Sequence, residues 1–222
     1  MKGILSDKEI RERLKKDLII HPLLHEPSQI AGCKVDLHLS GVFYEIMRSD
    51  VDSYDPVSFD ARLDFRREIV LPLGESLVLH PGDLILAPTF ENMSLPRDLM
   101  GLLQGRSSLG RLGIIVHATA SFVDPGFSGT VTLELSNLGH LPFRLYTLAR
   151  VATIAFYQAS EGVELAYDDP VPSPFVAKGI PLDHYASSKS QASKHHEDWE
   201  YGVIRKIRES SFKDTEELTD KS

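Results

Sequence analysis

The sequence predicts a mainly β fold, a barrel or sandwich of short strands with a short helix at the N-terminus. From residue 18 onward, short apolar runs alternate with Pro, Gly and Asp, among them LIIHPLL, VDLHL, GVFYEIM, EIVLPL, SLVLHPGDLILAP, TVTLEL, FRLYTL and VATIAFY. Many short runs separated by turn residues are typical of antiparallel sheets. With 222 residues and 42% hydrophobic composition, the chain is large enough to bury a core in one domain with an extension.

The predicted N-terminal helix occupies residues 6–16 (SDKEIRERLKK). Ser6 and Glu9 have capping-box spacing, in which each side chain bonds the backbone N–H of the other residue. Ile10 and Leu14 are four residues apart and therefore share one face of a helix. The segment predicts a short amphipathic helix.

Four further segments complete the expected organisation of the chain. Residues 95–103 (LPRDLMGLL) have helical apolar spacing, and residues 199–212 (WEYGVIRKIRESSF) fit a final amphipathic helix. Residues 49–67 are polar and acidic, which favours a surface excursion. Residues 170–175 (PVPSPF) have the proline spacing of a linker.

Composition excludes several functional classes. The net charge of −8 and pI near 5.6 argue against a nucleic-acid surface, which needs a basic patch, although a nucleotide needs only a local basic cluster. The single cysteine, Cys33, excludes a disulfide framework and suggests a reducing cytoplasm. We find no signal peptide and no apolar run near the roughly 18 residues of a membrane span. A soluble, cytoplasmic protein without a membrane partner is expected.

Residues 105–113 (GRSSLGRLG) carry the first functional signal. This polar turn could begin a helical turn at Ser107 or Ser108, where free backbone N–H groups favour an anion. Two arginines, Arg106 and Arg111, strengthen that preference. The segment is therefore a candidate phosphate site, although arginines and serines in a turn are as often solvated surface.

The chain that follows predicts two strands joined by a turn. Residues 114–123 alternate apolar with small or polar residues, and Asp-Pro-Gly at 124–126 is a strong turn signal. TVTLEL at 130–135 is rich in β-branched residues, which puts Glu134 on the same face as Thr130 and Thr132. A glutamate there is either a functional carboxylate or a solvent-face residue with an ion-pair partner.

In combination, these stretches resemble a known family. GRSSLGRLG followed by HATASFVDPGFSGTVTLE resembles the dCTP deaminase branch of the dUTPase-like nucleotide hydrolases, and AGCKVDLHLSG at 31–41 and LHPGDLILAPTFE at 79–91 support the match. The resemblance covers residues 4–167. It implies a dUTPase-like β-barrel or distorted jelly roll over residues 1–167, followed by a divergent tail at 168–222, and a homotrimer with sites shared between subunits.

The resemblance also implies a catalytic set. Glu134 would act as general base and acid, activating a water that attacks C4 of cytosine. Arg111 and Ser107 would hold that water and the glutamate, and the Ala120 carbonyl would contact the amino group or the water.

A substrate-binding set follows from the same resemblance. The phosphates would contact a basic and hydroxyl-bearing turn. The deoxyribose would contact an aspartate and an aromatic ring. For the aromatic ring, packing in the core is the equally weighted alternative. The implied residues are Arg106, Ser107, Ser108, Arg111, Asp124, Phe127, Thr132 and Tyr167.

The implied activity is hydrolytic deamination of dCTP to dUTP and ammonia, with Mg²⁺ held mainly by the triphosphate and water. Zinc is not expected, because zinc-dependent deaminases need a Pro-Cys-x-x-Cys pair and this chain has one cysteine. One alternative is a dUTP diphosphatase, or a bifunctional enzyme that acts on dCTP, with Asp124 carrying the phosphate chemistry. A more distant alternative is a non-catalytic nucleotide-binding protein. The altered tail favours it, because only Lys189 and Gln191 weakly resemble the lid motif of the family.

Overall fold

The structure is a computed structural model that describes residues 3–47, 66–119, 121–167 and 169. The chain divides into two compact units, and the first comprises Met1–Met47 and Arg66–Asp169. Everything below concerns that unit. Several predicted features lie outside the described residues. They are the helix expected at 199–212, the tail from residue 168 onward with the exception of Asp169, the residue Ala120, and all but the end of the 49–67 excursion.

The described chain contains more strand than helix. None of its helices is long and apolar enough to cross a membrane. In chain order the elements are α1 (Asp7–Leu14), β1 (Ile19–His21), α2 (Glu26–Gln29), β2 (Ile30–Ala31), β3 (Lys34–His38), β4 (Val42–Ile46), β5 (Arg66–Val70), β6 (Ser76–Leu79), β7 (Leu84–Ser94), β8 (Leu99–Gly105), α3 (Ser107–Gly110), β9 (Ile114–Ile115), β10 (Phe122–Val123), β11 (Ser128–Asn137), β12 (Phe143–Tyr146) and β13 (Arg150–Gln158).

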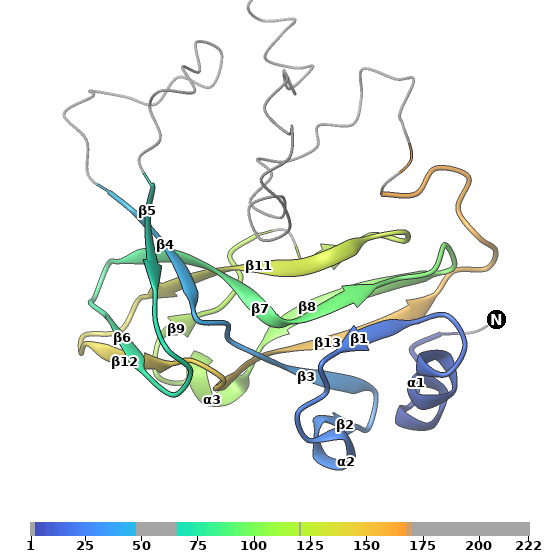
Figure 1. The fold of residues 1–222 in the computed structure, drawn as a ribbon, viewed down its shortest axis with the longest axis horizontal. Coiled ribbons are helices and arrows are strands. Elements are labelled where there is room, and N and C mark those ends of the chain that lie inside the picture. Colours follow the sequence, from blue (N-terminus) through green and yellow to red (C-terminus); the bar gives the residue numbers. More distant parts are fainter. Residues whose placement is uncertain (1–2, 48–65, 120, 168, 170–222) are drawn as a thin grey trace, which may run out of the picture. The chain divides into compact units, whose positions relative to one another are not determined.

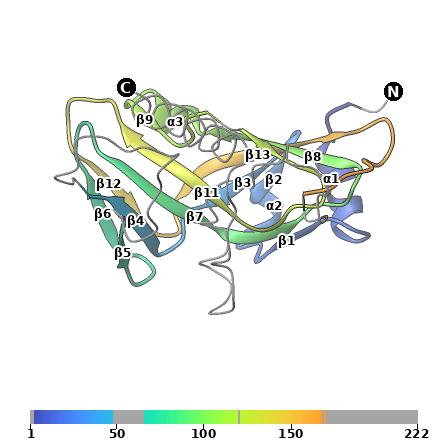
Figure 2. The ribbon, with the colours of Figure 1, turned by 90° about the horizontal axis from the view of Figure 1, so that it is seen from above.

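Two sheets of antiparallel strands form the body of the unit. One has the order β5-β4-β7-β11-β9, with β1 also paired to β7, and the other has the order β10-β8-β13-β3-β2. A separate ribbon pairs β12 with β6. In Figure 1 the long strands β7 and β11 run beside each other, as do β8 and β13, and Figure 2 shows the pair β7 and β11 on one side of the unit. The prediction of a mainly β fold is confirmed.

Buried apolar side chains from both sheets form one core. Phe43 on β4, Leu133 on β11 and Ile154 and Phe156 on β13 are all fully buried members of this cluster. Along β11, Leu133 and its alternate neighbours point into the core, whereas the intervening residues are half-buried. This period of two is what a strand with one core face requires, and it leaves the other face of β11 open to a ligand.

The helix predicted for residues 95–103 is wrong, because most of that segment is strand β8. Leu99 and Leu103 are buried on alternate positions, a period of two rather than 3.6. Gly101 between them fits closely against the neighbouring strand: a Cβ there would lie 2.6 Å from Ile154 Cδ1. Pairing with β13 along the whole of β8 overrides the apolar spacing that suggests a helix.

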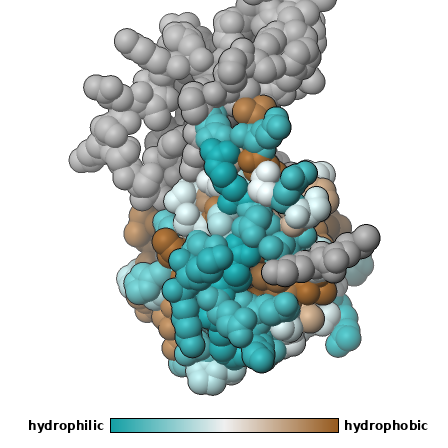
Figure 3. All heavy atoms as spheres, turned by 90° about the vertical axis from the view of Figure 1, so that its right-hand side faces the viewer, coloured by the Kyte–Doolittle hydropathy of each residue, from teal (hydrophilic) through white to brown (hydrophobic). Residues whose placement is uncertain are grey.

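The N-terminal helix forms as predicted. The Ser6 N–H donates to Glu9 Oε2 at 2.9 Å, and the Glu9 N–H donates to Ser6 Oγ at 3.4 Å, which completes the capping box. Ile10 is fully buried on the inner face. The outer side of this end of the unit is mostly hydrophilic in Figure 3.

An ion-pair cluster attaches α1 to the turn between β7 and β8. Arg13 donates to Asp98 through two nitrogens, at 2.6 Å and 3.0 Å, and to Asp17 through Nε at 2.6 Å. Such two-nitrogen contacts are the stronger kind of guanidinium–carboxylate pair. The hydrogen bond from Arg13 lowers the pKa of the Asp98 carboxyl below its ordinary value.

We predict that Asp98→Asn destabilises the unit by about 1–2 kcal/mol at pH 7, because it removes the charge that Arg13 binds. The folded-state pKa of Asp98 is lowered, so its contribution is present above the ordinary carboxyl pKa and is lost as the pH falls through the folded-state value. Urea unfolding at pH 7 and pH 3 measures this: the difference between wild type and variant narrows at pH 3.

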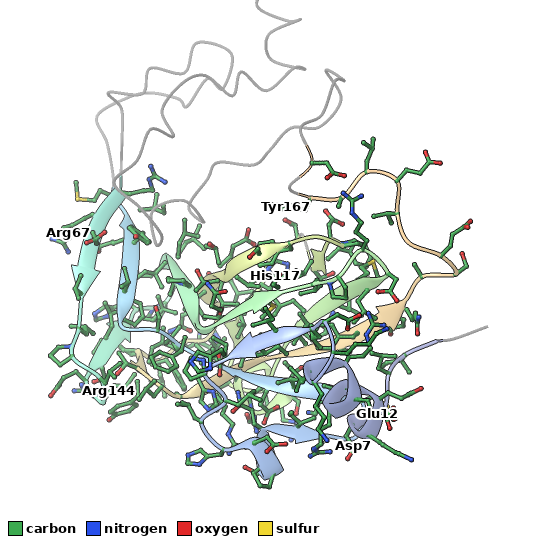
Figure 4. All side chains as sticks on the ribbon, turned by 45° about the vertical axis from the view of Figure 1, so that its right-hand side comes forward. Asp7, Glu12, Arg67, His117, Arg144 and Tyr167 are labelled. Atoms are coloured by element: carbon green, nitrogen blue, oxygen red, sulfur yellow. The ribbon has the colours of Figure 1, made fainter. Side chains whose placement is uncertain are left out.

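The control is Glu12→Gln on the outer face of the same helix (Figure 4), since Glu12 is exposed and its side chain forms no hydrogen bond within the described chain. Equal effects of the two substitutions at pH 7 would show that the Arg13 contact does not stabilise the fold.

Candidate functional site

Glu134 projects from the open face of β11, where the strand is flanked by β7 and by the segment after β9. Its backbone N–H donates to the Val116 carbonyl at 3.1 Å, and its Oε2 accepts the Ala118 N–H at 3.0 Å. The side chain is 33% exposed. Oε1 forms no hydrogen bond within the described residues. The carboxylate is therefore oriented through one oxygen, and the other is able to accept a hydrogen bond from water or a ligand.

His117 lies beside this carboxylate and was not among the residues that the sequence indicated. Its Nδ1 is 3.9 Å from Glu134 Oε2, and its side chain is only 10% exposed. Neither ring nitrogen has a hydrogen-bond partner within the part of the chain that the structure describes. Figure 4 shows His117 among the central strands. Buried polar atoms usually have partners, so the ring is suited to a water or ligand in this site.

The sequence offers only one signal for His117, which is its place between an apolar strand and the Ala-Thr-Ala segment. A lone histidine in such a run more often packs than reacts. Its relation to Glu134 depends on the return of the chain along β11, which brings Glu134 back beside His117 from seventeen residues later, and this return is not visible in local spacing.

The strand predicted over residues 114–123 is only partly correct. It is limited to the two-residue strands β9 and β10, and the chain between them leaves the ladder. The reason is that Glu134 bonds Val116 and Ala118 with its main chain and side chain, so these residues do not continue a regular pairing. β10 pairs with β8, whereas β11 pairs with β7, so the turn after β10 passes between the two sheets and does not close a hairpin.

The turn itself forms as predicted. The Phe127 N–H donates to the Asp124 carbonyl at 3.1 Å, and Gly126 has a φ of +84°, a conformation that favours glycine at the third position of a type II turn. The Asp124 side chain is exposed. Phe127 is 6% exposed and belongs to the core cluster, and its ring meets Tyr167 edge to face with centroids 5.3 Å apart.

Tyr167 reaches this turn from the segment that follows β13 (Figure 4). Its backbone N–H donates to the Pro125 carbonyl at 2.9 Å. The segment that carries Tyr167 thus packs against the turn that contains Asp124 and Phe127.

The GRSSLGRLG segment also forms the predicted helical turn. It is α3, which begins at Ser107 and has Arg106 at the N-cap. Ser107, Ser108 and Arg111 are exposed, and their side chains form no hydrogen bond or ion pair within the described ranges. Arg106 is instead fixed, since its Nη1 donates to Asp36 Oδ2 at 2.6 Å.

The predicted residues form three groups in the single chain. Glu134 lies with the 116–118 segment and shares its face of β11 with Thr132, which is opposite Pro88 on β7. The turn residues lie with Tyr167, and Arg106 lies with Asp36. Within the described ranges, no hydrogen bond or ion pair joins Arg111 or Ser107 to Glu134. These two residues are exposed and available to a ligand or to another copy of the chain.

No group of three or more His, Cys, Asp or Glu side chains among the described residues is arranged to hold a metal ion. Mg²⁺ keeps several waters and needs few protein ligands. The exposed carboxylate of Asp124 and the exposed serines fit an ion that arrives with a phosphate ligand.

We predict that Gly126→Ala disrupts the contact between the turn and Tyr167. A Cβ at residue 126 would lie 2.6 Å from Ala166 Cβ and 3.2 Å from the Tyr167 nitrogen, and the positive φ adds strain. We expect a loss of about 1–3 kcal/mol in urea unfolding. Gly162→Ala in the same segment is the control, because its Cβ would meet only Arg97 Cβ at 3.8 Å. Equal stability of both variants would contradict the tight packing.

Comparison with known proteins agrees with these features. Residues 4–159 match the family described as dCTP deaminase-like. A dCTP deaminase of Halorubrum lacusprofundi is 42% identical over 165 residues, covering 74% of this chain and 81% of that protein. A dUMP-forming dCTP deaminase of Halobacterium salinarum is 42% identical over 167 residues, covering 75% of this chain and 86% of that protein. A dUMP-forming dCTP deaminase of Dictyoglomus turgidum is 43% identical over 165 residues, covering 74% and 84%.

Among solved structures, the 2′-deoxycytidine 5′-triphosphate deaminase of Agrobacterium tumefaciens is similar with a TM-score of 0.57 and 25% sequence identity. The likeness covers 71% of this chain and 48% of that one, so the shared fold spans about half of the longer chain. The matched region contains α3, the turn and β11 with Glu134. The chain belongs to the dCTP deaminase-like family.

Proposed function

We propose that this protein is a dCTP deaminase that hydrolyses dCTP to dUTP and ammonia and so supplies deoxyuridine nucleotides. The observation that carries the proposal is the Glu134 carboxylate. It is half-buried on a paired strand, oriented by the Ala118 N–H, and keeps Oε1 available for water. The family to which this chain belongs and the names of its relatives point to the same activity.

The carboxylate has the chemistry that hydrolytic deamination requires. Glu134 removes a proton from water as the water oxygen bonds to C4 of cytosine, and it passes this proton to N3 as the C4=N3 double bond opens. Glu134 then takes the hydroxyl proton of the intermediate and delivers it to the amino nitrogen. The bond from C4 to the amino nitrogen breaks, ammonia leaves, and the C4 oxygen becomes the carbonyl of uracil. Arg111 and Ser107 orient the water and the glutamate, and the Ala120 carbonyl contacts the amino group or the water. His117 supplies a further polar surface beside the carboxylate.

Substrate binding uses the other two groups. Arg106 and Ser108 contact the phosphates, because an arginine and a hydroxyl at a turn supply charged and neutral donors. Asp124, Phe127 and Tyr167 form the sugar side of the site, and Thr132 lines the face of β11 beside Glu134. In this proposal residues 1–167 are the nucleotide-hydrolase core, and residues 168–222 are an extension whose sequence diverges from the family.

A homotrimer accounts for the separation of the groups. Arg111 and Ser107 are exposed and do not bond Glu134 in the described chain, so a second copy is able to bring them to the carboxylate. Each active site would then be shared between subunits, and a monomer would bind and turn over dCTP poorly.

Phosphate oxygens and water would hold Mg²⁺ with the triphosphate, and the ion would neutralise part of the phosphate charge. The reaction is zinc-independent in this proposal, since Glu134 itself activates the water. The protein acts in the cytoplasm, where its substrate and a reducing environment occur together.

A bifunctional enzyme that forms dUMP from dCTP is the second candidate. Two relatives at 42% and 43% identity bear the name dUMP-forming. Asp124 is exposed beside the sugar site and would activate the water that attacks the phosphate chain. Incubation with dCTP or dUTP and Mg²⁺, followed by chromatography and a pyrophosphate assay, separates the candidates.

In that assay, dUTP alone from dCTP supports the deaminase, whereas dUMP with pyrophosphate supports the bifunctional enzyme. Pyrophosphate from dUTP only would make the protein a dUTP diphosphatase. Binding of either nucleotide without any product would leave a nucleotide-binding protein and overturn the proposed catalysis.

We predict that Glu134→Gln lowers kcat for dCTP by about 10²–10⁴-fold, because the amide has the shape of the carboxylate but accepts no proton. Binding of dCTP persists, since the phosphate and sugar groups are intact. Ammonia release and equilibrium binding are the measurements. Arg111→Ala likewise impairs the catalytic step.

Glu161→Gln is the matched control, because Glu161 is exposed after β13 and belongs to none of the three groups. A wild-type rate for Glu134→Gln would remove the glutamate from the mechanism.

A further inference from the structure

Asp36 on β3 is a buried carboxylate shared by two arginines from distant parts of the chain. Arg106 Nη1 donates to Asp36 Oδ2 at 2.6 Å, and Arg150 Nη1 donates to the same oxygen at 3.3 Å. The aspartate is 7% exposed, whereas the two arginine side chains are 31% and 32% exposed. The cluster of Asp36, Arg106 and Arg150 therefore has a buried anion on the inside and two cations that reach solvent.

A second buried network fixes the backbone of Asp36. Gln29 Nε2 donates both to the Asp36 carbonyl at 3.0 Å and to Glu91 Oε1 at 2.8 Å. Glu91 is fully buried and also accepts the His38 N–H at 2.9 Å, with His38 Nδ1 2.5 Å from its Oε1. Strand β3 is thus held to α2 at Asp36 and to β7 at His38. The aspartate is a rigid anchor.

Arg106 uses only part of its donor set on this anchor. A guanidinium has five N–H donors in a fixed plane, and a single nitrogen of Arg106 bonds Asp36. Contact with a fixed carboxylate sets the plane of the remaining donors. The backbone of Arg106 is held as well, because its N–H donates to the Val151 carbonyl at 3.2 Å.

Charge favours an anion at the outer side of the cluster. Two arginines around one carboxylate leave one net positive charge, and Lys34 Nζ adds another 4.0 Å from Asp36 Oδ1. That second carboxylate oxygen has no hydrogen-bond partner among the described residues. Arg150 is further held by Ser28 Oγ at 3.1 Å, so it keeps Asp36 compensated when Arg106 turns toward a ligand.

We propose that Asp36 is a positioning residue for nucleotide binding: it orients the guanidinium of Arg106 so that the free donors meet the phosphate chain, and Arg150 balances the buried charge. This inference rests on the proposed function, in which Arg106 binds the phosphates. Asp36 itself does not touch the nucleotide. Its effect depends on the presence of Arg106.

The negative charge of Asp36 and its orientation of Arg106 predict opposite effects of Asp36→Asn on dCTP affinity. The sign of the measured change therefore distinguishes the two. Asp36→Asn removes a negative charge near the phosphates, so simple electrostatics would tighten dCTP binding. Loss of the oriented arginine would weaken it. We expect dCTP affinity to fall about tenfold, the equivalent of one charged hydrogen bond.

The measurement is calorimetric titration with dCTP and with deoxycytidine, in the Glu134→Gln background so that dCTP is not consumed. Deoxycytidine lacks phosphates, so its affinity should stay constant in Asp36→Asn. In the double variant with Arg106→Ala, Asp36→Asn should add less than about a twofold loss, because the positioned group is already absent. Arg144→Gln, which removes a charge on β12 without contacting Asp36, is the control (Figure 4).

Arg106→Lys supplies a second test, in which the buried Asp36 is left unchanged. Lysine keeps the charge but lacks the fork that contacts Asp36 and phosphate together, so its dCTP affinity should fall nearly as far as that of Arg106→Ala. If Asp36→Asn fails to fold, judged by its thermal unfolding, this variant decides the question.

Tighter or unchanged dCTP binding in a folded Asp36→Asn, an equal loss for deoxycytidine, or wild-type affinity in Arg106→Lys would each overturn the proposal. So would the absence of dCTP binding by the parent protein. Because binding is read without turnover, a parent that binds dCTP but never forms dUTP would overturn the proposed catalysis alone and leave the role of Asp36 standing.

Discussion

The antiparallel pairing of β11 with β7 is the constraint on which the candidate site depends. It runs from Ser128 opposite Ser94 to Ser136 opposite Leu84, with an irregularity between Thr130 and Thr132. Because side chains alternate along a strand, this register puts Leu133 into the core and Glu134 on the open face. A shift by one residue would exchange them. The buried leucines thus determine where the carboxylate points.

The same strand orders the segment that precedes it. Glu134 binds Val116 with its main chain and Ala118 with its side chain, so a loop that has left the sheet is still fixed at two points. His117 lies between these two points, which explains its burial beside the carboxylate. Glu134, which we propose as the catalytic residue, therefore also shapes the loop around it.

Local sequence chemistry predicts the elements whose causes are local. The capping box of Ser6 and Glu9, the turn at Asp124 and the start of α3 at Ser107 all depend on a few neighbouring residues, and all three form. The helix expected at 95–103 fails because strand pairing with β13 decides that segment. Likewise, the strand expected at 114–123 is interrupted because Glu134 forms hydrogen bonds with the backbone of this segment.

The residues of the candidate site also differ in how well the sequence alone predicts them. Glu134, Arg106 and the serines stand out by residue type and resemblance. The contacts of Asp36 with Arg106 and Arg150 do not, because these arginines follow Asp36 by 70 and 114 residues in the sequence and reach it only when β3, β13 and β8 form one sheet. In the proposed trimer Arg111 and Ser107 reach Glu134 from another subunit, and no spacing within one chain specifies such a contact.

The central claim is that water held by Glu134 attacks C4 of cytosine, and labelled water tests it most directly. The protein is incubated with dCTP and Mg²⁺ in H₂¹⁸O, and the nucleotide products are fragmented in a mass spectrometer to separate base from phosphates. We predict one ¹⁸O in the uracil base of the product, and no label in the base when Glu134 is replaced by Gln. Label confined to phosphate, with the cytosine unchanged, would contradict the account and identify the site as one for phosphate hydrolysis.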